Sequence, residues 1–173
     1  MKYAKALGMT IKLLAECKNV DGKWFASVAP DLIGSTHPLY SVNDVFNAIF
    51  VHGNMLGDAM FYGSGAGKLP TASAVVGDVV EAAKNLNTNV FPGWDSEKLN
   101  LVDHKSVESR FFVRMKADME AVMADVEAAF GPVEAKQVVD GEFGFITEKM
   151  AEISYLEKAA KFENILGMIR VRF

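Results

Sequence analysis

Cysteine, long apolar runs and clusters of basic residues are almost absent from this sequence of 173 residues. Cys17 stands alone, so it forms no internal disulfide and no cysteine-rich zinc site, and we expect a reducing compartment, the cytoplasm. No apolar stretch reaches the roughly 18 residues of a membrane-spanning helix, and the start lacks the apolar run of a signal peptide, so we expect no membrane partner. A pI near 5.4 and the lack of Lys/Arg clusters argue against a nucleic-acid partner.

Arginine is missing from the first half of the chain. Residues 1–84 hold 7 Lys, no Arg and 7 acidic residues, whereas residues 85–173 hold 11 basic and 15 acidic residues, which carry the whole net charge of −4. Glycine has the opposite bias, with 9 of 14 in the first half. A composition of 50% hydrophobic and 23% charged residues excludes a disordered chain. The shift in charge near the middle favours two domains.

The first half predicts strands, a hairpin and one helix. The opening residues resemble the last turn of a helix closed by Gly8, and from its missing beginning we expect that residue 1 is not the natural N-terminus. The Asp-Gly pair at 21–22 predicts a hairpin turn. We expect an irregular segment from Pro30 onward. The predicted strands are 10–16, 23–28, 45–51 and 58–62, and a helix is predicted over 71–86, with an apolar face of Val75, Val79, Ala82, Ala83 and Leu86.

The second half predicts a β-α-β-β-α-β order. Residues 87–109 are polar, contain Pro92-Gly93 and show no regular period, so we interpret them as a linker. Beyond them the patterns predict strands at 110–116, 133–139, 143–147 and 165–173, and helices at 119–130 and 151–162. The predicted class is α+β: a partial mixed-sheet domain for substrate binding and dimerisation, followed by a ferredoxin-like module of two helices on an antiparallel sheet.

The sharpest local motif is GSGAGKLPTASAVVGDVV at 63–80. Three alternate glycines between a strand and a helix let the backbone approach a ligand at the positive end of the helix. A P-loop would need Gly in place of Tyr62 and Ser or Thr in place of Leu69. A dinucleotide fingerprint would need Gly in place of Lys68. The residues alone leave a ligand cradle and a structural strand-to-helix turn both open.

The other chemistry-bearing residues show no constellation. His37, His52 and His104 are scattered without ligand spacing, so we predict no metal site. Cys17 is interpreted as a small apolar filler. Four acidic residues are predicted to face solvent: Glu142, Glu148, Glu152 and Glu157. Three methionines at helical spacing are predicted to face the core: Met119, Met123 and Met150. The residues by themselves indicate no catalytic residue.

Four runs of the first half resemble homoserine dehydrogenase, in the right order. They are AKALGMTIKLLA (4–15), VAPDLI (28–33), HPLYSVNDVFNA (37–48) and MFYGSGAGKLPTASAVVGDVV (60–80). The resemblance covers the second part of that family's catalytic domain. It implies an NAD(P)-dependent enzyme that interconverts L-homoserine and L-aspartate 4-semialdehyde, on the route to threonine and methionine.

The same resemblance assigns site residues. The family's Rossmann domain, its acidic substrate-binding residues and its catalytic lysine precede the segment that begins here, so this chain carries no catalytic residue. Gly67 matches the glycine beside the cofactor, and Gly65 and Ala66 shape the turn. Thr71 is expected to cap the following helix. The cofactor-binding residues implied by the family are therefore Gly65, Ala66, Gly67 and Thr71.

The second half resembles an ACT domain, the amino-acid-sensing module that often follows homoserine dehydrogenases. The stretch ADMEAVMADV (117–126) is similar to the family's D-x-P-G-V-L-A turn, with agreement at Asp118, Val122 and Ala124. Glu120 and Ala121 stand where that family has Pro and Gly. The added side chain and charge work against an amino-acid effector at this turn.

These observations predict three segments: 1–86 from the homoserine dehydrogenase catalytic domain, a linker at 87–109, and an ACT-like domain at 110–173. We expect the intact enzyme to use NAD(P), and this chain alone to be inactive, to hold no cofactor and to associate as a homodimer or higher homo-oligomer. Two alternatives remain, a non-catalytic ACT-type regulatory or dimerisation module and an amino-acid sensor.

Overall fold

The polypeptide forms two units in a computed structural model that describes residues 1–173. The larger unit combines Met1–Tyr40 with Leu99–Phe173, and the smaller is Ser41–Lys98. The strands of the larger unit are β1 (Thr10–Val20), β2 (Lys23–Ile33), β5 (Glu108–Met115), β6 (Glu134–Val139), β7 (Glu142–Ile146), β8 (Met150–Ala151) and β9 (Ile165–Arg172). Its helices are α1 (Lys2–Ala6), the short 3₁₀ helix η1 (His104–Ser106), α3 (Met119–Phe130) and α4 (Glu152–Ala159).

The first hairpin follows its turn signal. Asp21 and Gly22 have φ values of 52° and 77°, the left-handed pair that a tight two-residue hairpin requires, and Val20 pairs with Lys23. Both strands are longer than predicted, because β2 continues through Pro30, which pairs with Leu13. A proline lacks the N–H that a ladder needs, and Pro30 lies just before the point where β2 gains its second neighbour, at Asp31.

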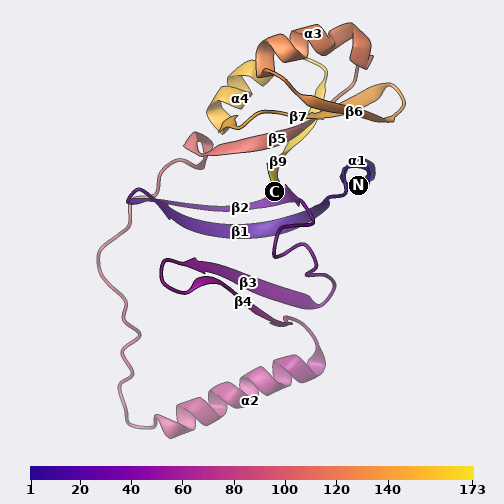
Figure 1. Cartoon of the computed structure of the whole chain (residues 1–173). Coiled ribbons are helices and arrows are strands. Elements are labelled where there is room, and N and C mark those ends of the chain that lie inside the picture. Colours follow the sequence, from indigo (N-terminus) through magenta and orange to yellow (C-terminus); the bar gives the residue numbers. More distant parts are fainter. The chain divides into compact units, whose positions relative to one another are not determined.

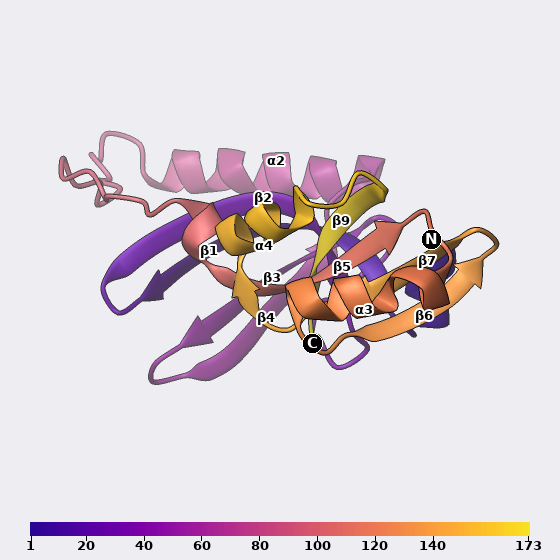
Figure 2. The ribbon, with the colours of Figure 1, turned by 90° about the horizontal axis from the view of Figure 1, so that it is seen from above.

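The predicted β-α-β-β-α-β order is present from β5 to β9, with one addition, the two-residue β8 before α4, which pairs with β5. These strands lie side by side as β9-β5-β7-β6, antiparallel throughout. Helices α3 and α4 cover one face of the strands (Figures 1 and 2). Asp118 begins α3 by accepting from the N–H groups of Glu120 and Ala121, and Gly131, at φ 81°, ends it. The α+β class is therefore confirmed.

The first hairpin extends this same sheet. β2 pairs in parallel with β9 through Asp31–Arg170, Leu32–Val171 and Ile33–Arg172, so the full order is β1-β2-β9-β5-β7-β6 and the sheet is mixed. The expected segments 1–86, 87–109 and 110–173 differ from the two compact units, because β2 of the first segment pairs with β9 of the last.

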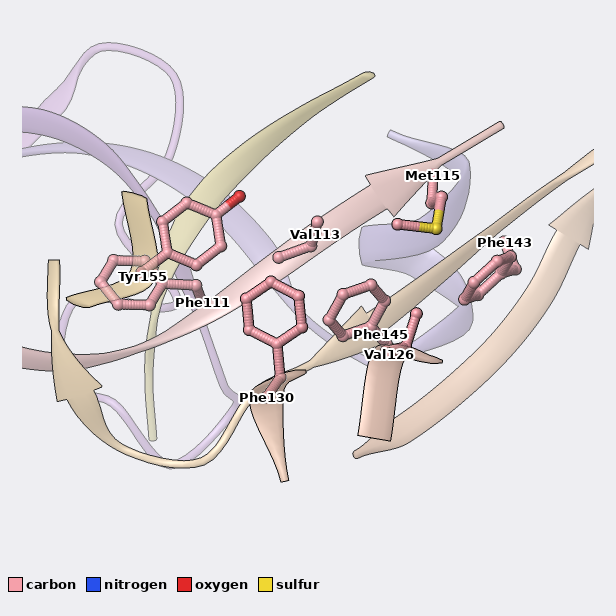
Figure 3. Packing of buried hydrophobic residues seen from close by; sticks show 8 residues of the cluster. All are labelled: Phe111, Val113, Met115, Val126, Phe130, Phe143, Phe145 and Tyr155. Atoms are coloured by element: carbon pink, nitrogen blue, oxygen red, sulfur yellow. The ribbon is translucent and has the colours of Figure 1, made fainter. Parts of the chain in front are cut away.

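The main core lies between this sheet and its two helices. Figure 3 shows Phe130 of α3 beside Phe145 and Phe111, with Tyr155 of α4 stacked on Phe111 at a ring-centroid distance of 4.8 Å. The buried members of this core are Phe111, Val113, Met115, Val126, Phe130, Phe143, Phe145 and Tyr155. The predicted core methionines Met119, Met123 and Met150 pack against it.

A second apolar cluster covers the opposite face of the sheet. Tyr3 and Ala4 of α1 pack with Leu32, Phe112 and Val171. The Tyr3 hydroxyl donates to the Glu142 carbonyl at 3.1 Å. Gly8, at φ 67°, follows the helix, as the sequence predicted. Both faces of the sheet are thus covered near its centre.

The smaller unit contains β3 (Phe46–Gly53), β4 (Gly57–Ser64) and α2 (Lys68–Lys84). β3 and β4 form a two-stranded antiparallel sheet from Phe46–Ser64 to Gly53–Gly57. No residue of this unit is buried, and the apolar face predicted for α2 is exposed, with Val75 at 57% and Val79 at 62%. None of the helices in the structure has both the length and the apolar character needed to cross a membrane.

Candidate functional site

The glycine-rich segment lies where β4 ends and α2 begins. Gly63 and Ser64 close the strand, Ala66 and Gly67 form a bend, and the helix starts at Lys68. Gly67 precedes the helix at φ 125° and ψ 149°, in a region that residues with a Cβ rarely adopt. This position therefore requires glycine on backbone grounds.

Gly65 is favoured for a different reason, its close approach to the Asn47 side chain. Its N–H donates to the Val45 carbonyl at 2.9 Å, which ties the loop to the residue before β3. A Cβ at position 65 would lie 1.4 Å from Nδ2 and 3.1 Å from Cβ of Asn47. Gly63, by contrast, has no atom within 4 Å of such a Cβ. The backbone therefore requires glycine at 67, and the Asn47 side chain would have to move to accept another residue at 65.

Thr71 does not cap α2. Gly67 occupies the capping position, no side chain caps the helix, and the Thr71 N–H donates to the Gly67 carbonyl at 3.0 Å. The expectation failed because the helix begins at Lys68 rather than at 71, so that Thr71 lies inside the first turn. A proline lacks an N–H, so Pro70 gives this helix start one donor fewer than usual.

The electrostatic character of this helix start is positive. The first turn has no acidic residue, and Lys68 is its first member. The unpaired N–H groups and the aligned peptide dipoles of a helix N-terminus attract anions. The arrangement combines a helix start without a side-chain cap, an exposed glycine at position 67 and the exposed Lys68. It is suited to a phosphate-bearing ligand.

The three histidines lie apart. His52 pairs with Asp58 across the tip of the β3–β4 hairpin at 2.5 Å, and His104 lies 3.6 Å from Asp103 beside η1. His37 is half-buried in the turn after β2. The structure brings no three His, Cys, Asp or Glu side chains into a group that could hold a metal ion. Cys17 is exposed on β1, which corrects its interpretation as an apolar filler.

A partly buried ionic network was not predicted. Arg172 of β9 binds Asp31 of β2 through Nε–Oδ2 at 2.6 Å, and Glu16 of β1 through Nη1–Oε1 at 3.0 Å. Burial acts to lower the pKa of Arg172, but Asp31 and Glu16 outweigh that effect and raise it. The one sequence feature that could have indicated this network is the aspartate inside the apolar run VAPDLI, since a charged residue there needs a partner. Its partner lies 141 positions away in the sequence.

Glu152 belongs to a similar buried contact. The sequence placed it on a solvent face, yet its residue is only 7% exposed and its carboxylate pairs with Arg170. The prediction was wrong because Glu152, the first residue of α4, pairs with Arg170 of β9, a strand in the interior of the sheet. Glu142 is also largely covered and pairs with Arg114 at 3.1 Å.

Comparison with known proteins places these features in a family. The family model for homoserine dehydrogenase matches residues 1–80. The homoserine dehydrogenase of Corynebacterium glutamicum is 44% identical over 138 residues, covering 75% of this chain and 31% of that protein. The homoserine dehydrogenase of Mycobacterium bovis is 38% identical over 153 residues, covering 84% of this chain and 35% of that protein.

Solved structures agree over nearly the whole chain. A homoserine dehydrogenase from Thiobacillus denitrificans matches with a TM-score of 0.77 and 25% identity, covering 98% of this chain and 44% of that one. The S. aureus homoserine dehydrogenase at pH 6.5 matches with a TM-score of 0.71 and 29% identity, covering 99% and 43%. This chain spans about a third of the length of the curated relatives. It belongs to the homoserine dehydrogenase family and corresponds to one segment of its longer members.

Proposed function

We propose that this chain is part of an NAD(P)-dependent enzyme that interconverts L-homoserine and L-aspartate 4-semialdehyde. The observation that carries the proposal is the match of residues 1–80 to the homoserine dehydrogenase family, which includes the glycine-rich loop before α2. Bound NAD(P) supplies or accepts the hydride in this reaction. This reaction belongs to amino-acid biosynthesis.

The loop residues bind the cofactor in this proposal. Gly67 lets the cofactor approach the backbone, Gly65 holds the loop against the strand pair, and Ala66 completes the bend. The first turn of α2, with Lys68, favours a phosphate group. Thr71 belongs to the proposed site as a residue of this first turn, whose N–H donates to the Gly67 carbonyl, and not as a helix cap. The chain itself supplies no general acid or base, so proton transfer requires residues from the remainder of the enzyme.

Two further parts of the proposal concern assembly. Residues 110–173 form an ACT-like module, supported by the strand order β9-β5-β7-β6 with two helices on one face. The smaller unit associates with a second copy of the chain, because a two-stranded sheet and a helix without buried residues are not stable by themselves. Ile49 and Phe61, each 67% exposed, are paired on its strands.

A chimeric enzyme tests the catalytic proposal. Residues 1–173 replace the matching segment of the Corynebacterium glutamicum homoserine dehydrogenase, and homoserine oxidation is followed through NADPH formation. We expect the chimera to turn over homoserine and the isolated chain to show no turnover. A folded chimera without activity, or an active isolated chain, would contradict the assignment.

Gly67→Ala in the chimera tests the role of the loop. Its Cβ is strained at φ 125° by about 1–2 kcal/mol, so we expect the KM for NADP to rise about tenfold. Gly77→Ala is the matched control, since Gly77 lies within the same helix and has open space around it. Equal changes in KM from the two substitutions would show that the loop is not part of the cofactor site.

A further inference from the structure

The turn after β2 is organised around one imidazole ring. Gly34 continues from β2 and donates its N–H to the Arg172 carbonyl at 3.0 Å. The His37 N–H donates to the Gly34 carbonyl at 3.1 Å, and the Tyr40 N–H donates to the His37 carbonyl at 2.9 Å. The Leu39 N–H donates to Nδ1 of the His37 ring at 3.1 Å. These three hydrogen bonds within the turn beyond Gly34 all involve His37.

The sequence explains why the ring takes this role. Pro38 follows His37 and has no N–H, so Leu39 provides the next backbone donor. A proline also keeps the preceding residue out of the helical region, which leaves the His37 side chain free to reach forward over two residues. The contact copies an Asx turn, in which an Asn or Asp side chain accepts from the N–H two positions ahead.

This hydrogen bond exists in only one charge state of the ring. Nδ1 accepts a hydrogen bond when it carries no proton, so His37 is neutral and its proton resides on Nε2. An imidazolium has protons on both nitrogens and cannot accept from Leu39. Protonation therefore removes this bond and places two N–H groups against each other.

The charges around the ring are balanced in number. Arg172 of β9 and Lys18 of β1 disfavour a positive ring, whereas Asp31 of β2 and Glu16 of β1 favour it. Asp31 and Glu16 are already paired with Arg172, which limits what they offer to an imidazolium. Burial has the largest effect and the charge of Arg172 the next largest, and together they lower the pKa of His37 below its ordinary 6.5.

We propose that the Gly34–Tyr40 turn is a proton-sensitive connection: neutral His37 holds it closed, and protonation of the ring releases Leu39. The turn connects the larger unit to Ser41, the first residue of the unit that carries the glycine-rich loop. Acid thus loosens the turn that leads into one of the two chain crossings between the units, the other being at Lys98–Leu99. The effect arises within this chain and does not depend on the cofactor proposal.

The pH dependence follows from linkage. An unfolded His37 takes up a proton near 6.5, and the ring in the closed turn takes it up at a lower pH. The stabilisation of the turn is therefore complete above about pH 6.5 and is lost as the pH falls toward the pKa of the folded ring. At neutral pH the turn is closed.

Nuclear magnetic resonance on the full chain tests the proposal. The ¹⁵N shift of Nδ1 and the exchange protection of the Leu39 amide, corrected for intrinsic exchange, are followed between about pH 5 and about pH 8. We expect an unprotonated Nδ1 at neutral pH and at least a tenfold loss of Leu39 protection on acidification. The Gly34 amide is an internal reference, because its acceptor is the Arg172 carbonyl.

Two variants separate the ring's charge from its hydrogen bond. His37→Asn retains an acceptor for Leu39 and does not titrate, so its Leu39 protection should be independent of pH. His37→Ala lacks the acceptor and should leave Leu39 unprotected throughout. Loss of protection in His37→Asn at the pH where the natural chain loses it would overturn the proposal. A protonated Nδ1 at neutral pH in the natural chain would overturn it without any variant.

Discussion

Arg172 and Asp31 form an ion pair that joins the last strand of the chain to its second strand, with 2.6 Å between Nε and Oδ2. The Asp31 residue is only 2% exposed, and its Oδ1 is buried without a hydrogen-bond partner. Arg172 also bridges to Glu16, so one guanidinium serves carboxylates on two strands. β2 and β9 share three residue pairs, and Leu32 and Val171 of these strands also lie in one apolar cluster, so the ion pair adds to apolar packing at this junction.

Replacing Arg172 by Met should destabilise the larger unit by about 3 kcal/mol, because the substitution leaves the Asp31 carboxylate buried without its counter-ion. Urea unfolding followed through tryptophan fluorescence in a Trp94→Phe background measures the change, since the remaining Trp24 lies on β2. Lys149→Met is the matched control: its partner Glu108 is 62% exposed at the side chain, and such surface pairs contribute at most about 1 kcal/mol. Similar losses of unfolding free energy in both variants would show that the buried pair contributes no more to stability than the surface pair.

Gly144→Ala should destabilise the same unit by about 2 kcal/mol, through overpacking. A Cβ on Gly144 would lie 2.5 Å from Cζ of Phe112 and 3.1 Å from Cδ1 of Tyr3, two rings that pack on each other. Gly167→Ala, also on a strand, meets no atom within 4 Å and should be close to neutral. The midpoint of thermal unfolding distinguishes the two variants, and a neutral Gly144→Ala would show that the rings yield easily.

The sequence predicted the bounds of a helix or hairpin well where capping or turn residues mark its ends. Helix α3 occupies the predicted residues 119–130 because Asp118 caps its start and Gly131 ends it. The hairpin at Asp21-Gly22 formed where expected. The strand β2, in contrast, passes through Pro30, because a proline is tolerated where a strand has no partner for its N–H.

Long-range pairing was beyond the reach of sequence patterns. No periodicity connects Ile33 with Arg172, yet their pairing fuses the first hairpin with the last strand. The burial of Asp31 and Glu152 follows from that arrangement, and neither was predicted. For the candidate site, the position of the glycine-rich loop between a strand and a helix was predicted. The close approach of Gly65 to Asn47 required the structure.

Gly65→Ala should impair the glycine-rich loop by displacing Asn47. In the chimeric enzyme we expect the KM for NADP to rise about fivefold, the equivalent of about 1 kcal/mol. Gly63→Ala, which meets no atom within 4 Å, should change it by less than about twofold. Adding Asn47→Ala to Gly65→Ala removes the amide that the new Cβ meets at 1.4 Å and should restore part of the affinity. No restoration would show that the loop fails for another reason.

Tyr155 should be the last tyrosine of the chain to ionise. Burial, and secondly the negative charge of Glu152, raise its pKa to about 12, from 10.0. An unfolded Tyr155 loses its proton first, so its contribution to stability is complete below about pH 10 and is lost as the pH rises toward 12. Alkaline titration of phenolate absorbance measures this step. Tyr155→Phe should delete the highest-pH step, whereas Tyr62→Phe, at an exposed position, should leave it in place. A Tyr155→Phe titration that retains the step would mean that another tyrosine ionises last.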